Sequence, residues 1–137
     1  MKYLILIVSV LALAAASCDV TPPPASNPAQ SRCVLSAGLT CDNYELIDGQ
    51  LSLDLVNGMG RALDIESVEY LARESSAQGC VETQLGTVEN GATITVEFDE
   101  ICRARTDTWY DITIRYVNAG LSDTPLRTLT GELYIIS

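Results

Sequence analysis

The sequence predicts an all-β protein in which antiparallel strands form a two-sheet sandwich, preceded by an N-terminal signal helix. Three observations support this prediction. Several segments alternate apolar and polar residues with a period of two, Asn-Gly pairs typical of tight turns adjoin some of them, and four cysteines lie in the same region. The 137 residues suffice for one such domain and leave little room for a second.

Residues 1–17 are predicted to be a lipoprotein-type signal peptide. Lys2 is followed by an uncharged run, Tyr3 to Ala16, which as a helix spans about 21 Å and so falls short of a hydrocarbon core of roughly 30 Å. Small residues then precede Cys18, and this resembles the lipobox of prokaryotic lipoproteins, in which the cysteine is acylated and becomes the mature N-terminus. Ala15 stands where that family usually has Leu. The alternative is ordinary signal cleavage without acylation.

The number of cysteines favours acylation of Cys18. Without it, an even set remains, and in an exported chain such a set predicts disulfides. We expect the local pairs Cys33 with Cys41 and Cys80 with Cys102. The rival interpretation is a four-cysteine zinc site, which the sequence disfavours because the usual Cys-x₂₋₄-Cys spacing is absent.

Residues 18–32 are predicted to be the lipidated cysteine and a proline-rich tether. Four of the five prolines lie between residues 19 and 31, and such a stretch cannot bury enough apolar surface to fold alone. In an extended form it rises ~3.1 Å per residue and reaches about 40 Å. Removal of the signal peptide leaves seven Arg against 18 acidic residues, a net charge of −11, which argues against a nucleic-acid partner.

Residues 33–137 are predicted to form the sandwich. The clearest strand is 110–116, where large apolar side chains alternate strictly with polar ones. Similar alternation predicts further strands at residues 51–56, 63–70, 94–98 and 129–135. The phase slips near Ser67, which predicts a β-bulge. Residues 71–79 lose the period, and we expect a short helix or a loop there.

One ordered set of residues spans the whole predicted domain. It comprises Cys33-x₄-Gly38-Leu39-x-Cys41, Tyr44, Leu46, Leu51-x-Leu53-x-Leu55, Asn57-Gly58-Met59-Gly60, Ile65, Cys80, Asn90-Gly91, Cys102, Tyr110-x-Ile112-x-Ile114-x-Tyr116 and Gly131-x-Leu133. This set resembles the cysteine-bearing β-sandwich at the C-terminus of archaeal type IV pilin-like and other secreted surface proteins. The resemblance implies an Ig-like Greek-key fold outside the cell and brings no catalytic residues. It ends at the N-terminus, because those pilins keep a long hydrophobic helix as the filament core, whereas the apolar run here precedes a lipobox.

The residue content gives little support to catalysis. The chain has no His, so the commonest general base and metal ligand is missing. It also lacks a Gly-x-Ser-x-Gly elbow, a Gly-rich phosphate loop and a Walker-type Lys. Two carboxylates suffice for glycoside hydrolysis, and the candidates are Asp99, Glu100, Asp107 and Asp111. We expect these side chains to be ordinary surface acids and the protein not to be an enzyme.

The same four acids, Asp99, Glu100, Asp107 and Asp111, are the candidates for a calcium site. They surround Cys102 in the sequence, and oxygen-rich loops suit a hard cation. The chain has no EF-hand or repeat spacing, and no other cofactor is predicted.

Two further groups of residues are candidates for binding. Arg103, Arg105 and Arg115 are compatible with an anion site, although pairing with neighbouring acids is the expected arrangement. Trp109 and Tyr110 are compatible with stacking on a sugar, although we expect at least one of them in the core. An exposed Trp109 would favour the sugar hypothesis.

The leading functional prediction is a surface lipoprotein of the cell envelope, anchored to the membrane by a lipid on Cys18 and carrying a non-catalytic sandwich for adhesion or interaction. Its partner would be a surface protein, a glycan or another copy of the chain. One alternative is a subunit of an extracellular filament or surface layer that assembles through strand edges, with residues 129–136 exchanged between copies. The other is a module that binds calcium or a small ligand.

Overall fold

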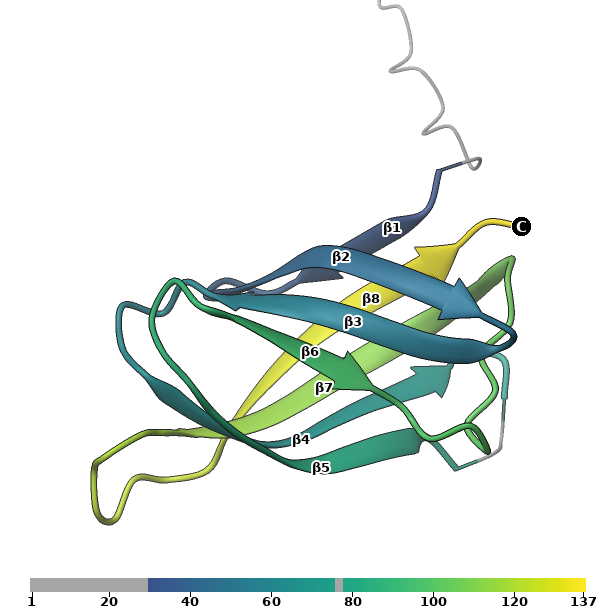
Figure 1. Cartoon of the computed structure of the whole chain (residues 1–137). Helices are drawn as coiled ribbons and strands as arrows, with labels where there is room; N and C mark the ends of the chain where they lie inside the picture. Colours follow the sequence, from purple (N-terminus) through teal and green to yellow (C-terminus); the bar gives the residue numbers. More distant parts are fainter. Residues whose placement is uncertain (1–29, 76–77) are drawn as a thin grey trace, which may run out of the picture.

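The computed structural model describes residues 30–75 and 78–137 and confirms an all-β sandwich (Figure 1). Its strands are β1 (Arg32–Leu35), β2 (Leu39–Ile47), β3 (Gln50–Asn57), β4 (Leu63–Ala72), β5 (Cys80–Val88), β6 (Thr93–Glu97), β7 (Thr108–Asn118) and β8 (Arg127–Ile135). The predicted signal helix at residues 1–17 and Cys18 lie outside the described residues. Within these residues the structure has no helix that is long and apolar enough to cross a membrane.

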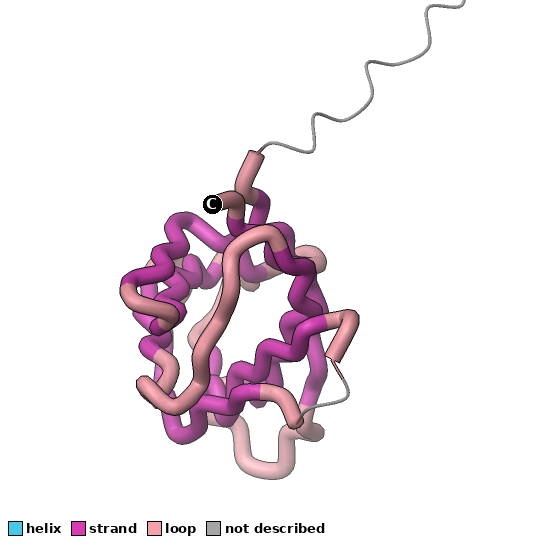
Figure 2. The backbone as a smooth tube through the Cα atoms, turned by 90° about the vertical axis from the view of Figure 1, so that its right-hand side faces the viewer, coloured by secondary structure: helices cyan, strands magenta, loops and turns pink. Residues whose placement is uncertain are grey.

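The eight strands form two antiparallel sheets. The large sheet has the order β1-β8-β7-β4-β5 and the small sheet the order β2-β3-β6. Four connections cross between the sheets, namely β1–β2, β3–β4, β5–β6 and β6–β7, and this gives the Ig-like Greek-key arrangement. Viewed along the strands, the two layers enclose one interior (Figure 2).

Alternation along the strands builds the core between the sheets. On β7, Tyr110, Ile112, Ile114 and Tyr116 point inward and are buried, as the period of two predicts. On β3, the inward residues Leu51, Leu53 and Leu55 are fully buried. The bulge expected near Ser67 is present, because the register of β4 shifts between Ile65 and Ser67 against both β5 and β7.

Three strands, β1, β2 and β5, were not predicted from the sequence. A register shift between Cys41 and Asn43 interrupts the alternation of β2, which is otherwise a half-exposed edge strand. Positive φ angles at Gln84 and Gly86 break the pattern of β5 in the same way. In the segment expected to be a short helix or a loop, β4 continues through Ala72, and the described remainder is turn and irregular chain.

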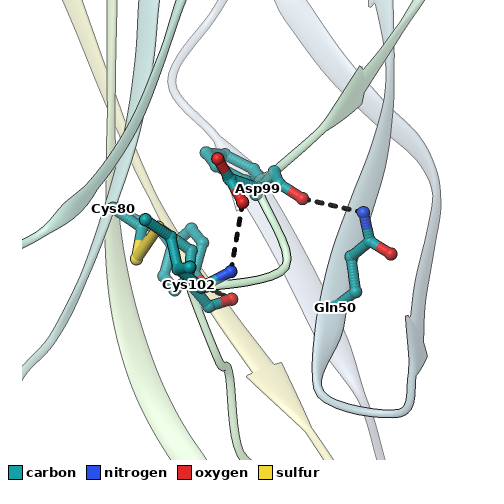
Figure 3. Close-up of a disulfide and its surroundings, with 7 residues drawn as sticks. Gln50, Cys80, Asp99 and Cys102 are labelled. Carbon is teal, nitrogen blue, oxygen red and sulfur yellow. Dashed lines mark hydrogen bonds between the residues drawn. A yellow bond between two sulfur atoms is a disulfide. The ribbon is translucent and has the colours of Figure 1, made fainter.

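Both predicted disulfides are present and tie different parts of the sandwich together. Cys33 of β1 in the large sheet is bonded to Cys41 of β2 in the small sheet. Cys80, at the start of β5, is bonded to Cys102 in the β6–β7 loop (Figure 3). The four cysteines are therefore consumed as disulfides and do not form the alternative zinc site.

The region around Cys102 is held by further hydrogen bonds. The Tyr70 hydroxyl donates to the Cys102 carbonyl at 2.9 Å, and Gln50 Nε2 donates to the Phe98 carbonyl at 2.9 Å (Figure 3). Burial, and after it the charge interaction with Tyr110, raises the pKa of Tyr70 to about 12. Tyr70 therefore stays protonated, and remains a hydrogen-bond donor, at any ordinary pH.

Asn57 is the only charged or amide side chain that is completely buried among the described residues. Its Nδ2 donates to the carbonyls of Arg61 at 2.8 Å and Val88 at 3.0 Å, and its Oδ1 accepts from the Met59 amide at 2.9 Å. Its backbone bonds to Gly91 and Ala92. Asn57 therefore stabilises the β3–β4 turn and also joins it by hydrogen bonds to the end of β5 and to the β5–β6 turn.

One prediction concerns Asn57. Asn57→Ala removes three side-chain hydrogen bonds at a completely buried position, so we expect the free energy of unfolding to fall by about 2–4 kcal/mol. Denaturant unfolding measures this loss. Asn43→Ala, at an exposed position on β2, is the control and should change stability by less than about 0.5 kcal/mol. Equal effects of the two substitutions would contradict the role assigned to Asn57.

A second prediction compares the two disulfides. The loop-closure model gives about 3.5 kcal/mol for the Cys80–Cys102 bridge and about 2.5 kcal/mol for Cys33–Cys41, since the longer loop restricts the unfolded chain more. The double variants C80A/C102A and C33A/C41A should lose stability in that order when unfolded in denaturant under oxidising conditions. A larger loss for the C33A/C41A pair would show that the tie between the two sheets matters more than loop length.

Candidate functional site

A row of aromatic and basic residues crosses the outer face of the large sheet. The register pairs Arg32 of β1 with Tyr134 of β8, and Tyr134 with Trp109 of β7. Arg73, just after β4, continues the row because its amide donates to the Trp109 carbonyl at 3.0 Å. The neighbouring residues Tyr110 and Leu133 are buried, so alternation places this row on the outside.

The adjacent row supplies two acids that bind the basic residues. Arg73 Nε donates to Asp111 Oδ1 at 2.7 Å, and Arg73 Nη2 donates to Glu132 Oε2 at 2.9 Å. Arg32 Nη2 lies 3.4 Å from Glu132 Oε1. We call Arg32, Glu132, Arg73 and Asp111 the charged network. The hydrogen bonds from Arg73 to Glu132 and then to Asp111 raise the pKa of the Arg73 guanidinium above its usual value, so Arg73 keeps its positive charge at any physiological pH.

Trp109 is partly exposed, with 37% of its surface accessible, and its ring is flanked by neighbours in the row. The Arg73 Cζ atom lies 5.2 Å from the centre of the Trp109 ring, a cation–π distance. On the β8 side, the centre of the Tyr134 ring lies 4.9 Å away with a tilt of 34°. The aromatic pair is thus presented at the surface in a fixed orientation, next to the charged network.

A shallow hollow of about 470 Å³ lies beside the charged network. Arg73, Asp111 and Glu132 border it, and the short side chains of Thr113 and Thr130 leave it open. It is also lined by Val34 and Leu35 of β1 and by Ser36, which follows that strand. Hydroxyl, carboxylate and guanidinium groups therefore face one depression, together with the exposed side chain of Val34. Such a surface suits a polar partner that offers both donors and acceptors.

The structure does not bring together the four acids predicted to bind calcium. Asp111 lies on β7 and binds Arg73, whereas Asp107 accepts from the Ser137 amide at 3.3 Å. Asp99 accepts from the Ile101 amide at 3.2 Å, and Glu100 is exposed. Among residues 30–75 and 78–137, no three Asp, Glu, Cys or His side chains are grouped so as to hold a metal ion.

The residues predicted for sugar and anion binding are brought together only in part. Trp109 is exposed, as the sugar hypothesis expects. Arg103 and Arg105 border one hollow, whereas Arg115 lies apart from them on β7. Tyr110 is 3% exposed, and its hydroxyl bonds to the backbone of Arg105, so it belongs to the core, as expected for at least one of the aromatic pair. Arg103 donates to the Asp48 carbonyl at 3.3 Å, and Arg115 is exposed on the outer face of β7. In the described part of the chain, the ion pairs involve Arg32 and Arg73 and not the three arginines expected to pair.

Sequence reasoning named Asp111 and Trp109 but missed their partners. Arg73 lies in the segment where the periodicity is lost, and Arg32 was placed in the tether. Glu132 and Tyr134 do occupy outward positions of a predicted strand. Which residues lie beside Glu132 and Tyr134 depends on the register between β1, β8 and β7, and the alternation pattern alone does not predict that register. No family model matches the chain, and no curated protein matches it either.

A prediction follows for Trp109, the only Trp in the chain. Arg73→Gln removes the guanidinium beside the ring and exposes the ring to water. We expect its fluorescence emission to move to longer wavelength and acrylamide quenching to increase. Arg115→Gln, a change on the same face away from the ring, is the control and should leave both unchanged. Identical spectra for Arg73→Gln and the native protein would show that Arg73 does not cover Trp109 in solution.

Proposed function

We propose that the protein is exported, is attached to a membrane of the cell envelope by a lipid on Cys18, and presents its sandwich as a non-catalytic interaction or adhesion domain. The observation that carries the proposal is the pairing of Cys33 with Cys41 and of Cys80 with Cys102. Such pairing is compatible with an extracytoplasmic location. It also leaves Cys18 as the one cysteine of the chain without a disulfide partner in the domain, directly after an apolar run and small residues.

The outer face of the large sheet is the surface that we propose for interaction. Its polar groups are held in place by one another, because each member of the charged network contacts another member on a neighbouring strand or segment. A partner therefore meets an ordered surface and loses less free energy in ordering it. Trp109 and Tyr134 add aromatic area beside the network, and aromatic and Arg side chains are enriched at protein interfaces.

Assembly through strand edges receives less support from the fold. β8, which was expected to be exchanged between copies, is paired on both sides by β1 and β7. Of the four edge strands, β1 has four residues and β6 has five, β2 carries a register shift, and β5 contains two residues with positive φ. Short and irregular edges of this kind hinder pairing between molecules.

A prediction tests the anchor. In protein extracted from native membranes, mass spectrometry should find an N-terminal peptide that begins at Cys18 and carries the mass of attached acyl chains. Cys18→Ser should abolish acylation and reduce retention in the membrane fraction, because multiple acyl chains, each CH₂ contributing ~0.8 kcal/mol, provide the attachment. An unmodified N-terminus located after residue 18 would overturn the anchor while leaving the sandwich domain intact.

A further inference from the structure

Another hollow, of about 180 Å³, is lined by residues at the β3–β4 connection, the end of β7 and the start of β8. In Figure 1 these segments lie at the end of the sandwich opposite the C-terminus. The lining residues are Met59, Arg61, Leu63, Tyr116, Asn118 and Arg127. None of these lining residues is acidic, although acids outnumber bases by more than two to one in the chain.

Two polar residues of this hollow stand at inward-facing positions of the large sheet. Arg127 is paired with the buried Tyr116 and precedes the buried Leu129 by two residues. Asn118 follows Tyr116 by two residues and is paired with the fully buried Leu63. Alternation therefore places Arg127 and Asn118 on the inward-facing side at this end of the large sheet, where Asn118 is buried and Arg127 is exposed at the mouth of the hollow.

The polar groups of the hollow have no partners within the described protein. Over residues 30–75 and 78–137, neither the Arg61 nor the Arg127 side chain forms an ion pair or a hydrogen bond. The Asn118 side chain, 8% exposed, forms no hydrogen bond in the same part of the chain. No fully buried side-chain N or O atom there lacks a partner, so the polar atoms of Asn118, a lining residue of the hollow, remain accessible to solvent. By contrast, the other buried Asn, Asn57, forms hydrogen bonds through both Nδ2 and Oδ1 of its side-chain amide.

We propose that this hollow, the Arg61–Arg127 site, binds a carboxylate group. Two guanidinium groups and the NH₂ group of Asn118 supply donors with no acidic side chain in the lining, and the planar fork of Arg matches the two oxygens of a carboxylate. Both arginines line the same hollow, and two positive charges there favour a bound anion.

The volume of the hollow and the net charge of the chain restrict the kinds of ligand that fit. The volume is below the roughly 300–1,000 Å³ of pockets for drug-sized ligands, so the site accommodates a single functional group. The net charge of the whole chain, −10, repels polyanions such as nucleic acid or an anionic membrane. Met59, Leu63 and Tyr116 provide apolar walls that suit the carbon skeleton of an organic acid better than a fully hydrated phosphate.

The carboxylate has two possible sources, a free small acid or an acidic side chain of a partner protein. The test therefore uses sodium acetate and a capped tripeptide whose single carboxylate belongs to Glu, with inorganic phosphate as a third probe. Each probe is titrated at constant ionic strength into the exported protein, and the NMR signals of the arginine side chains are followed. We expect saturable shifts with acetate or the peptide. Arg61→Gln and Arg127→Gln should each weaken binding roughly tenfold or more, the order expected for loss of a charge-assisted pair.

Arg115→Gln is the matched control, because Arg115 is an exposed arginine on the outer face of the same sheet. It should leave the affinity unchanged. Thermal unfolding and intact mass verify that every variant is folded and disulfide-bonded, and Arg127→Lys, which keeps the charge but loses the fork, serves if Arg127→Gln does not fold. Unsaturable shifts, equal effects of Arg115→Gln and Arg127→Gln, or tighter binding of phosphate than of both carboxylates would overturn the proposal. Tighter binding of the peptide than of acetate would identify a protein partner as the source.

Discussion

The structure depends on ties that cross between its two sheets. A domain of this size buries only about two-thirds of the surface of its unfolded chain, so its core alone gives modest stability. β1 has only four residues, and two interactions hold it in the large sheet. These are the Cys33–Cys41 disulfide to β2 and close packing against β8. That packing requires Gly131, since a Cβ atom there would overlap the Val34 carbonyl and the Leu35 side chain. Asn57 also ties the two sheets together, because its side chain on β3 of the small sheet donates to the Val88 carbonyl at the end of β5 in the large sheet.

Because the disulfide and the Asn57 hydrogen bonds act between the two sheets, the outer face of the large sheet is not needed for the core and carries polar residues. A surface ion pair contributes little stability, and the charged network is exposed. Its value lies in orientation, because Arg73 holds Asp111, Glu132 and the Trp109 ring at the same time. The network is therefore better explained as an ordered surface than as a stabilising element, and this supports a role in interaction.

The sequence predicted those parts of the fold that depend on alternation alone. β3, β7 and β8 were found because their inward residues are large and apolar and their outward residues are polar. β2 and β5 were missed because a bulge in one and positive φ angles in the other shift the pattern. The site was predicted only in part. Asp111 was assigned to calcium because its neighbours in the chain are acidic, whereas its neighbour in space is Arg73, and only strand register brings the two together.

Loops bind one another at both ends of the sandwich, but arginine side chains at one end are left without partners in the described residues. At the end where the described chain begins and ends, the loops bind one another, through Ala104 to Gly49, Asp107 to Ile135 and Ile136 to Ser31. At the opposite end, Arg61, Arg127 and Asn118 remain without protein partners in the described residues. A lipid on Cys18 and an extended tether would place the first end toward the membrane and direct the second outward. The unsatisfied donors would then lie where a molecule arriving from outside the cell first meets the protein.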